Sequence, residues 1–142
     1  MLSKIQTNRR AGFTLVEIMI VVAIIALLAA IAVPSALRAR KRSQATSTLE
    51  TLRMLDSACD QWAIETGQSS SASPAATTLA QYVKKGTKLY TDLIAGHAYD
   101  AIGTDITLPQ VDIAPGLATG TYTSLSDVAG TDFWGPYYTS GS

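Results

Sequence analysis

The residue whose type and position point most clearly to chemistry is Glu17. It is the only charged residue among the 21 residues from Phe13 to Val33, most of which are apolar. A carboxylate inside a bilayer costs on the order of a few kcal/mol unless it is paired. An acid in such a place therefore predicts a function that involves a partner.

Other reactive groups are few. The single cysteine, Cys59, excludes an intrachain disulfide, and as a catalytic thiol it would need His97, the single histidine. Its position on a helix face instead predicts a small, buried apolar residue, and we interpret His97 as a loop residue. The sequence has no phosphate-binding loop, no zinc-ligand spacing and no evident pair of nucleophile and base, so we expect that the protein is not an enzyme.

Charge is balanced overall but unevenly placed. The 142 residues include 11 basic and 11 acidic ones, which predicts no bulk attraction to nucleic acid. Residues 1–12 carry Lys4, Arg9 and Arg10 and no acid. The part of the chain after residue 43, about a hundred residues, can form one small domain with a modest core.

The apolar run near the N-terminus is long enough to cross a membrane. Residues 13–33 would form a helix of about 32 Å, close to the hydrocarbon thickness of a bilayer. Three interpretations compete: a simple anchor, a secretory signal cut after Ala32, or a leader cut before the run. Glu17, at the edge of the run, serves neither of the first two.

The segment from Arg9 to Glu17, RRAGFTLVE, resembles the processing site of type IV prepilins and type II secretion pseudopilins. In this family a short basic leader ends in glycine, the mature chain starts with phenylalanine, and a glutamate follows four residues later. Gly12, Phe13 and Glu17 match the pattern, and Pro34 falls where many members have a helix-kinking proline. The resemblance covers roughly the first 40 residues.

This resemblance implies that a membrane-embedded aspartic protease, the prepilin peptidase, cuts between Gly12 and Phe13 and methylates the new amine. Gly12 has no side chain, so its backbone can lie close to an active site. Glu17 would then pair with the Phe13 amine of a neighbouring helix, which penalises wrong stacking more than it adds affinity. The alternative is that Glu17 lies at the headgroup boundary and contacts only water.

Pro34 predicts a kink or a local unwinding of the helix, and four basic residues follow it: Arg38, Arg40, Lys41 and Arg42. These side chains would anchor the helix end among lipid phosphates or, in a filament, pair with acids of a neighbour. The positive-inside rule is ambiguous because basic residues lie on both sides of the run. The resemblance implies a single-pass chain of the inner membrane with an extracytoplasmic C-terminal domain.

After Ser43 the apolar residues become periodic. One stripe, at spacings of three and four, contains Ala45, Leu49, Leu52, Leu55, Cys59, Trp62 and Ala63. The spacing predicts an amphipathic helix, so that one long helix would run from about Thr14 to Thr66 and stop at Gly67.

We expect a short helix at 79–85 and short strands at 98–102, 106–108 and 120–123. The predicted fold is α+β and pilin-like, with the amphipathic half of the long helix packed on a small antiparallel sheet. The predicted parts are a leader (1–12), a transmembrane or filament-core helix (13–43) and a periplasmic or extracellular domain (44–142).

The C-terminal segment DFWGPYY, which starts at Asp132, is similar to the Asp-x-Trp-Gly segment of major pseudopilins, where a nearby loop binds calcium. Asp127 and Asp132, with Ser124 or Ser126, could supply oxygen ligands. No further carboxylate follows Asp132, however. We favour the alternative that Trp134 fills the core, that Asp132 caps a turn, and that the protein needs no metal or other cofactor.

The resemblance thus implies a structural subunit of a type IV pilus-like filament. Its partners would be copies of itself, other pilin-like subunits, the prepilin peptidase and an inner-membrane assembly platform with its ATPase. The single cysteine favours a secretion pseudopilin, because many surface pilins close a C-terminal loop with a disulfide. The alternatives are an adhesive or motility pilin and, in another class, a membrane-tethered binding domain that does not polymerise.

Overall fold

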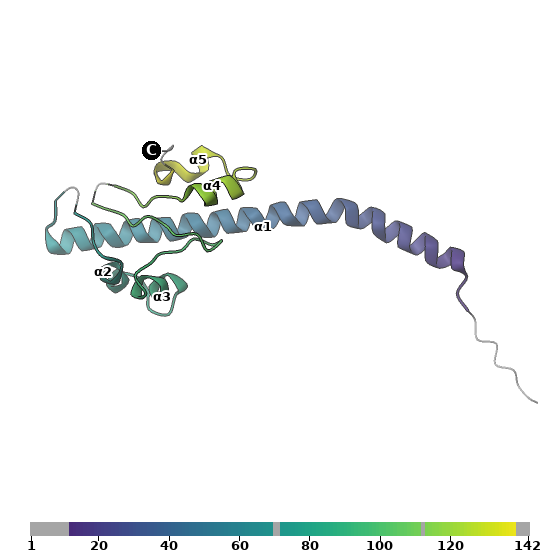
Figure 1. Ribbon diagram of the computed structural model, residues 1–142, viewed down its shortest axis with the longest axis horizontal. Helices are drawn as coiled ribbons and strands as arrows, with labels where there is room; N and C mark the ends of the chain where they lie inside the picture. The colour runs from purple at the N-terminus through teal and green to yellow at the C-terminus, as the bar shows by residue number, and fades with distance from the viewer. Residues whose placement is uncertain (1–11, 70–71, 112, 139–142) are drawn as a thin grey trace, which may run out of the picture. The chain divides into compact units, whose positions relative to one another are not determined.

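A computed structural model describes residues 12–69, 72–111 and 113–138 of the chain (Figure 1). The chain divides into two compact units, which meet between Leu37 and Arg38. The predicted leader lies outside the described residues except for Gly12, and the domain boundaries predicted at 12/13 and 43/44 stay predictions.

The predicted long helix is confirmed. Helix α1 spans Leu15–Thr66, 52 residues, with Pro34 inside it and helical residues on both sides of the proline. It ends as predicted at Gly67, which has a φ of +63°, and the Gln68 N–H donates to the Ala63 carbonyl at 3.2 Å. A left-handed glycine with this hydrogen bond is the Schellman ending of a helix.

In the first unit, α1 has no buried face. Its large apolar side chains are each at least half exposed: Leu15, Val16, Ile18, Met19, Ile20, Val21, Val22, Ile24, Ile25, Leu27, Leu28, Ile31, Val33 and Leu37. By length and composition this helix can cross a membrane. Within this unit no other described residue covers these side chains, and an apolar surface of this size is typical of a helix that contacts lipid or other molecules.

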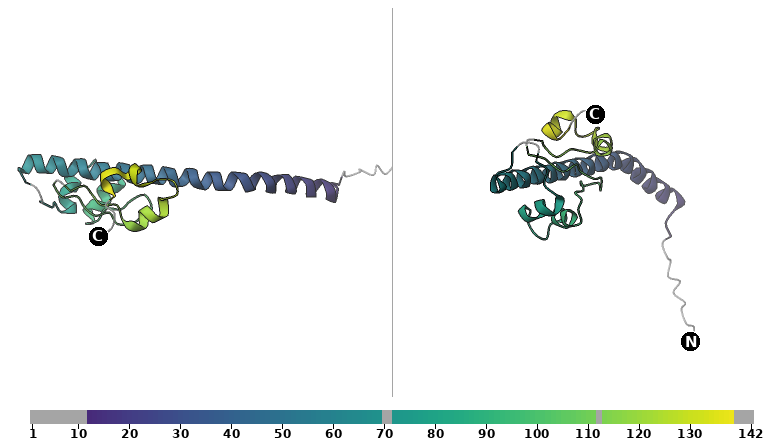
Figure 2. Two further views of the ribbon diagram at one scale, coloured as in Figure 1. Left: turned by 90° about the horizontal axis from the view of Figure 1, so that it is seen from above. Right: turned by 60° about the vertical axis from the view of Figure 1, so that its left-hand side comes forward.

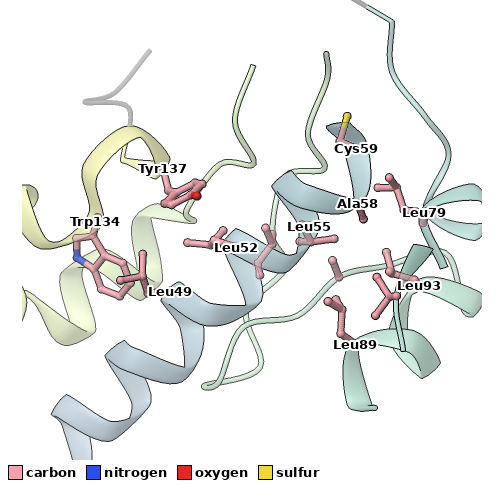
Figure 3. Packing of buried hydrophobic residues seen from close by; sticks show 14 of the residues in the cluster. Leu49, Leu52, Leu55, Ala58, Cys59, Leu79, Leu89, Leu93, Trp134 and Tyr137 are labelled. Atoms are coloured by element: carbon pink, nitrogen blue, oxygen red, sulfur yellow. The ribbon is translucent and has the colours of Figure 1, made fainter. Parts of the chain in front are cut away.

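In the second unit, the amphipathic half of α1 carries the core. Five members of the predicted stripe are buried, namely Ala45, Leu49, Leu52, Leu55 and Cys59, whereas Trp62 and Ala63 are only half-buried. Figure 3 shows this stripe between two groups of side chains, with Trp134 and Tyr137 on one side and Leu79, Leu89 and Leu93 on the other. The stripe therefore organises a core with two flanks.

Short helices form these two flanks (Figures 1 and 2). One flank consists of α2 (Ala76–Leu79), the 3₁₀ turn η1 (Ala80–Tyr82) and α3 (Lys88–Ile94). The opposite flank consists of α4 (Thr119–Leu125), α5 (Thr131–Trp134) and the 3₁₀ turn η2 (Gly135–Tyr137). The helix predicted at 79–85 is thus found earlier, at residues 76–82, as α2 and η1.

The predicted antiparallel sheet is wrong. The described residues contain no β-strand, only isolated antiparallel bridges that pair Tyr99 with Asp105, Thr107 with Gly116, and Gln110 with Ile113. Pro109 and Pro115 interrupt this region, and proline cannot donate to a ladder. In the second unit the fold is therefore the amphipathic half of α1 packed against short helices and irregular segments, not the α+β unit that the sequence predicted.

A buried aspartate explains why 98–102 forms a turn and not a strand. The Asp100 Oδ1 atom accepts hydrogen bonds from the Ile102 N–H at 2.9 Å and the Thr104 N–H at 2.8 Å, so these donors are lost to any neighbouring strand. Its Oδ2 atom accepts from the Thr121 hydroxyl, which lies in α4. Residues 120–123, which the sequence predicted as a strand, instead lie in α4. The hydrogen bond from Thr121 to Asp100 attaches α4 to this turn.

We expect Trp134→Ala to lower the free energy of unfolding by about 3–5 kcal/mol, because the indole is 0% exposed and its removal leaves a cavity. The neighbouring Phe133, which is 40% exposed, is the matched control, and Phe133→Ala should cost clearly less than Trp134→Ala because it leaves a smaller cavity. Denaturant unfolding of the full chain in detergent, followed by near-ultraviolet circular dichroism, measures both. Equal losses for the two variants would contradict the assignment of Trp134 to the core.

Candidate processing and assembly site

Gly12, Phe13 and Thr14 lie exposed immediately before α1. A Cβ atom built on Gly12 would meet nothing within 4 Å, and its φ lies outside the left-handed region. Neither the backbone conformation nor the described surroundings of Gly12 therefore require a glycine. Any requirement for glycine at this position must come from a molecule that binds it.

Thr14 and Glu17 form a capping box at the start of α1. The Thr14 N–H donates to Glu17 Oε2 at 2.8 Å, and in return the Glu17 N–H donates to Thr14 Oγ1 at 3.3 Å. The Thr14 hydroxyl also donates to Glu17 Oε2 at 2.7 Å. These bonds satisfy N–H groups that a helix start leaves free. This role of Glu17 is not among the predictions above, although the spacing Thr-x-x-Glu before an apolar run is the sequence pattern of a capping box.

Glu17 shares a surface with Phe13 and the first apolar turn of α1. These two residues line an open cavity of about 310 Å³ together with Ile18, Ile20 and Val21. Phe13 is 83% exposed, and the Glu17 side chain is likewise exposed. The carboxylate is thus reachable from outside the chain, beside the residue that would become the new N-terminus.

The basic residues after Pro34 differ in their partners. Lys41 forms an ion pair with Asp127, with Nζ at 3.0 Å from Oδ2, and both side chains are about half exposed. An exposed pair of this kind contributes at most about 1 kcal/mol. Arg38, Arg40 and Arg42 are exposed and form no ion pair with any residue that the structure describes.

The two calcium candidates are not brought together into a metal site. The Asp127 carboxylate faces Lys41, and Asp132 lies exposed in the first turn of α5, where no side chain caps the helix. Among the described residues, no group of three or more His, Cys, Asp or Glu could hold a metal ion. The prediction that Trp134 fills the core is confirmed, since its side chain is completely buried, whereas the prediction that Asp132 caps a turn is wrong, because no described side chain caps α5.

Cys59 and His97 lie in unlike surroundings. Cys59 is a free, buried thiol, and its burial, together with the nearby carboxylates of Asp60 and Asp56, raises its pKa. A thiol with a raised pKa is a poor nucleophile. His97 is exposed, and its ring stacks on Tyr99 with the ring centroids 5.7 Å apart.

Two polar contacts of the core were not predicted. Thr48, in the buried stripe of α1, accepts a hydrogen bond from the Ala101 N–H at 3.2 Å. The Tyr137 hydroxyl donates to Asp56 Oδ2 at 3.3 Å, and burial followed by repulsion from Asp60 raises the pKa of Asp56. Both contacts attach the segments after residue 97 to α1, so their role is to hold the fold.

Comparison with protein families identifies the N-terminal segment. Residues 7–33 match the family described as the prokaryotic N-terminal methylation motif. The chain thus carries the signature of type IV pilin and pseudopilin precursors, and Gly12, Phe13 and Glu17 all lie within the matched segment. Neither the comparison with curated proteins nor that with solved structures gives a significant match.

Proposed function

We propose that the chain is the precursor of a structural subunit of a type IV pilus-like filament. The observation that carries the proposal is that the methylation motif, residues 7–33, includes the first part of a helix, from Leu15 to Val33, whose apolar side chains are exposed all round. Such a surface requires a bilayer before assembly and neighbouring helices after it. A cut before the helix keeps this surface on the mature chain.

In this proposal the prepilin peptidase cuts between Gly12 and Phe13 and methylates the amine of Phe13. The exposed backbone around Gly12, free of neighbouring atoms among the described residues, fits access by a protease. Residues 13–43 then anchor the subunit in the inner membrane and pack in the filament core, and 44–142 form the extracytoplasmic domain. The chain acts as a structural subunit and not as an enzyme.

Assembly would use copies of the chain, other pilin-like subunits and a membrane platform driven by an ATPase. Glu17 is the proposed assembly residue, since its carboxylate is exposed beside Phe13. On joining a neighbour, it would exchange contacts with Thr14 for the cationic amine of the adjacent subunit. Pairing favours the correct stagger of helices because an unpaired charge in an apolar core is costly.

Within this class we favour a type II secretion pseudopilin. The single cysteine is buried and cannot close the C-terminal disulfide loop that many surface pilins have. The second support is the Asp-x-Trp-Gly segment, which resembles that of major pseudopilins and whose Trp134 is buried in the core. An adhesive or motility pilin is the second candidate. In another class, a membrane-tethered binding domain would share the anchor but would not polymerise.

The proposal is tested on the mature protein. Mass spectrometry of the membrane form should find N-methylated Phe13 as the first residue, and imaging of sheared surface or periplasmic material should show fibres that contain this chain. A mature chain that begins at Val33 would lack the helix and overturn the proposal. A Phe13 terminus without fibres under conditions that express the whole assembly system would favour the tethered domain.

A further inference from the structure

The second unit has an open pocket on the flank that contains α3. The pocket is lined by Ala80 and Gln81 of η1, by Lys85, and by Tyr90 and Ile94 of α3, and has a volume of about 310 Å³. This lies at the small end of ligand pockets, which span about 300–1,000 Å³. Ile94 is 53% exposed, although Leu93 beside it is fully buried. The pocket thus presents an apolar and aromatic wall to the outside and can accept one large side chain.

One cation lies at this pocket without an anion to balance it. Lys85 is exposed and belongs to no ion pair within the described ranges, unlike Lys88, which pairs with Asp92. A ligand that fills the pocket with an apolar group and brings a carboxylate to Lys85 would satisfy both features.

The opposite flank presents a side chain of this kind. Phe133 on α5 is 40% exposed although it is large and apolar. Its ring lies edge-to-face on the buried Trp134, with centroids 5.0 Å apart and an interplanar angle of 89°. This contact on a core residue holds the ring in place. The adjacent Asp132 is exposed and, in the part of the chain that the structure describes, forms no ion pair.

Within the second unit, this knob (Asp132 and Phe133) and the pocket are on opposite flanks of α1, as Figure 1 and the right-hand view of Figure 2 show for α5 and α3. A subunit therefore cannot place its own knob in its own pocket. Two different surfaces that complement each other make a head-to-tail contact, which propagates into an open chain where its rotation does not close a ring.

The geometry points to a docking contact between copies of this chain, in which Phe133 of one copy enters the Tyr90–Ile94 pocket of the next and Asp132 pairs with Lys85. The inference rests on the proposed function and adds to it a contact between globular domains, beside the packing of the apolar helices. Filament assembly holds neighbouring domains at high effective concentration, so a small contact of this kind suffices to select their arrangement.

Charge exchange in the full chain tests the contact. Lys85→Glu and Asp132→Lys each place like charges together at the knob and pocket, and each should reduce the yield of sheared filaments about tenfold. The double variant restores opposite charges and should recover most of the yield. Lys84→Glu and Asp105→Lys change exposed charges that line neither surface, so they serve as matched controls with yields near those of the unmodified chain.

The amount of chain in the membrane and its Phe13 terminus are measured alongside the yield, because both should be the same in all variants. Filaments of normal yield from both single variants would overturn the docking contact and leave the proposed function intact. Losses in both single variants that the double variant does not recover would also overturn it. If the unmodified chain is cut at Phe13 but never forms filaments, the proposed function fails first and this contact fails with it.

Discussion

Glu17→Gln is expected to leave a chain that enters the membrane and is cut at Phe13 but forms no filaments. Glutamine, like glutamate, can serve as the acceptor in a capping box, so the start of α1 should persist. What the variant loses is the negative charge. The amine of the neighbouring Phe13 would then be buried without a partner, at a cost of about 3–5 kcal/mol for each contact.

Thr14→Ala separates capping from charge pairing. This variant removes the hydroxyl that contacts Glu17 and accepts from its N–H, at a cost of about 0.5–2 kcal/mol of helix stability, but it leaves the carboxylate in place. It should therefore assemble, whereas Glu17→Gln and Glu17→Ala should not. Electron microscopy of sheared material, with membrane fractions as the control, measures the difference. Normal filaments from Glu17→Gln would contradict a role for the charge. Loss of filaments from Thr14→Ala, which keeps the carboxylate, would show that the capping contact is what assembly needs.

Gly12→Val is expected to block processing and to accumulate the uncut precursor in the membrane. Nothing among the described residues requires a glycine at position 12, since a Cβ atom there would have open space around it. A branched side chain next to the scissile bond would instead displace the backbone in the protease, and a misplacement of about 1 Å can slow a reaction on the order of 100-fold. Pulse-chase labelling with gel separation of precursor and mature chain measures the rate.

The size of the side chain at position 12 supplies the control for this experiment. Gly12→Ala adds one methyl group, so its cleavage rate should lie between those of the unmodified chain and Gly12→Val. Both variants should keep the fold of the second unit, because Gly12 belongs to the first unit. Cleavage of Gly12→Val before Phe13 at the normal rate would mean that the protease does not need a small residue there.

Much of α1 could be predicted because its signals are local. The apolar run and the stripe of Leu49, Leu52 and Leu55 are patterns within one helix, and Gly67 ends it through its own backbone conformation. Burial at these positions follows from a spacing that places apolar side chains on one face. The processing segment is similarly local, since Gly12, Phe13 and Glu17 lie within six residues of one another.

The segments after residue 97 could not be predicted in this way. Thr121, Tyr122 and Thr123 are residue types that favour strands, but they lie in α4, where the Thr123 hydroxyl donates to the Thr119 carbonyl at 2.9 Å. Strand propensity reflects packing on a sheet surface, and the described residues offer no sheet. The tertiary environment of Thr121, which bonds to Asp100, prevails over the local preference.

The sequence by itself determined the apolar helix, its processing segment and its amphipathic continuation, because length, charge and periodicity act over a few turns of one element. Only the tertiary structure decided how the segments after Gly67 cover the amphipathic half of α1. Its contacts join residues far apart in sequence, such as Lys41 with Asp127 and Asp56 with Tyr137, and no local pattern marks such partners. The pocket at Tyr90 and the exposed knob at Phe133 likewise exist only because short helices pack on opposite flanks of one stripe.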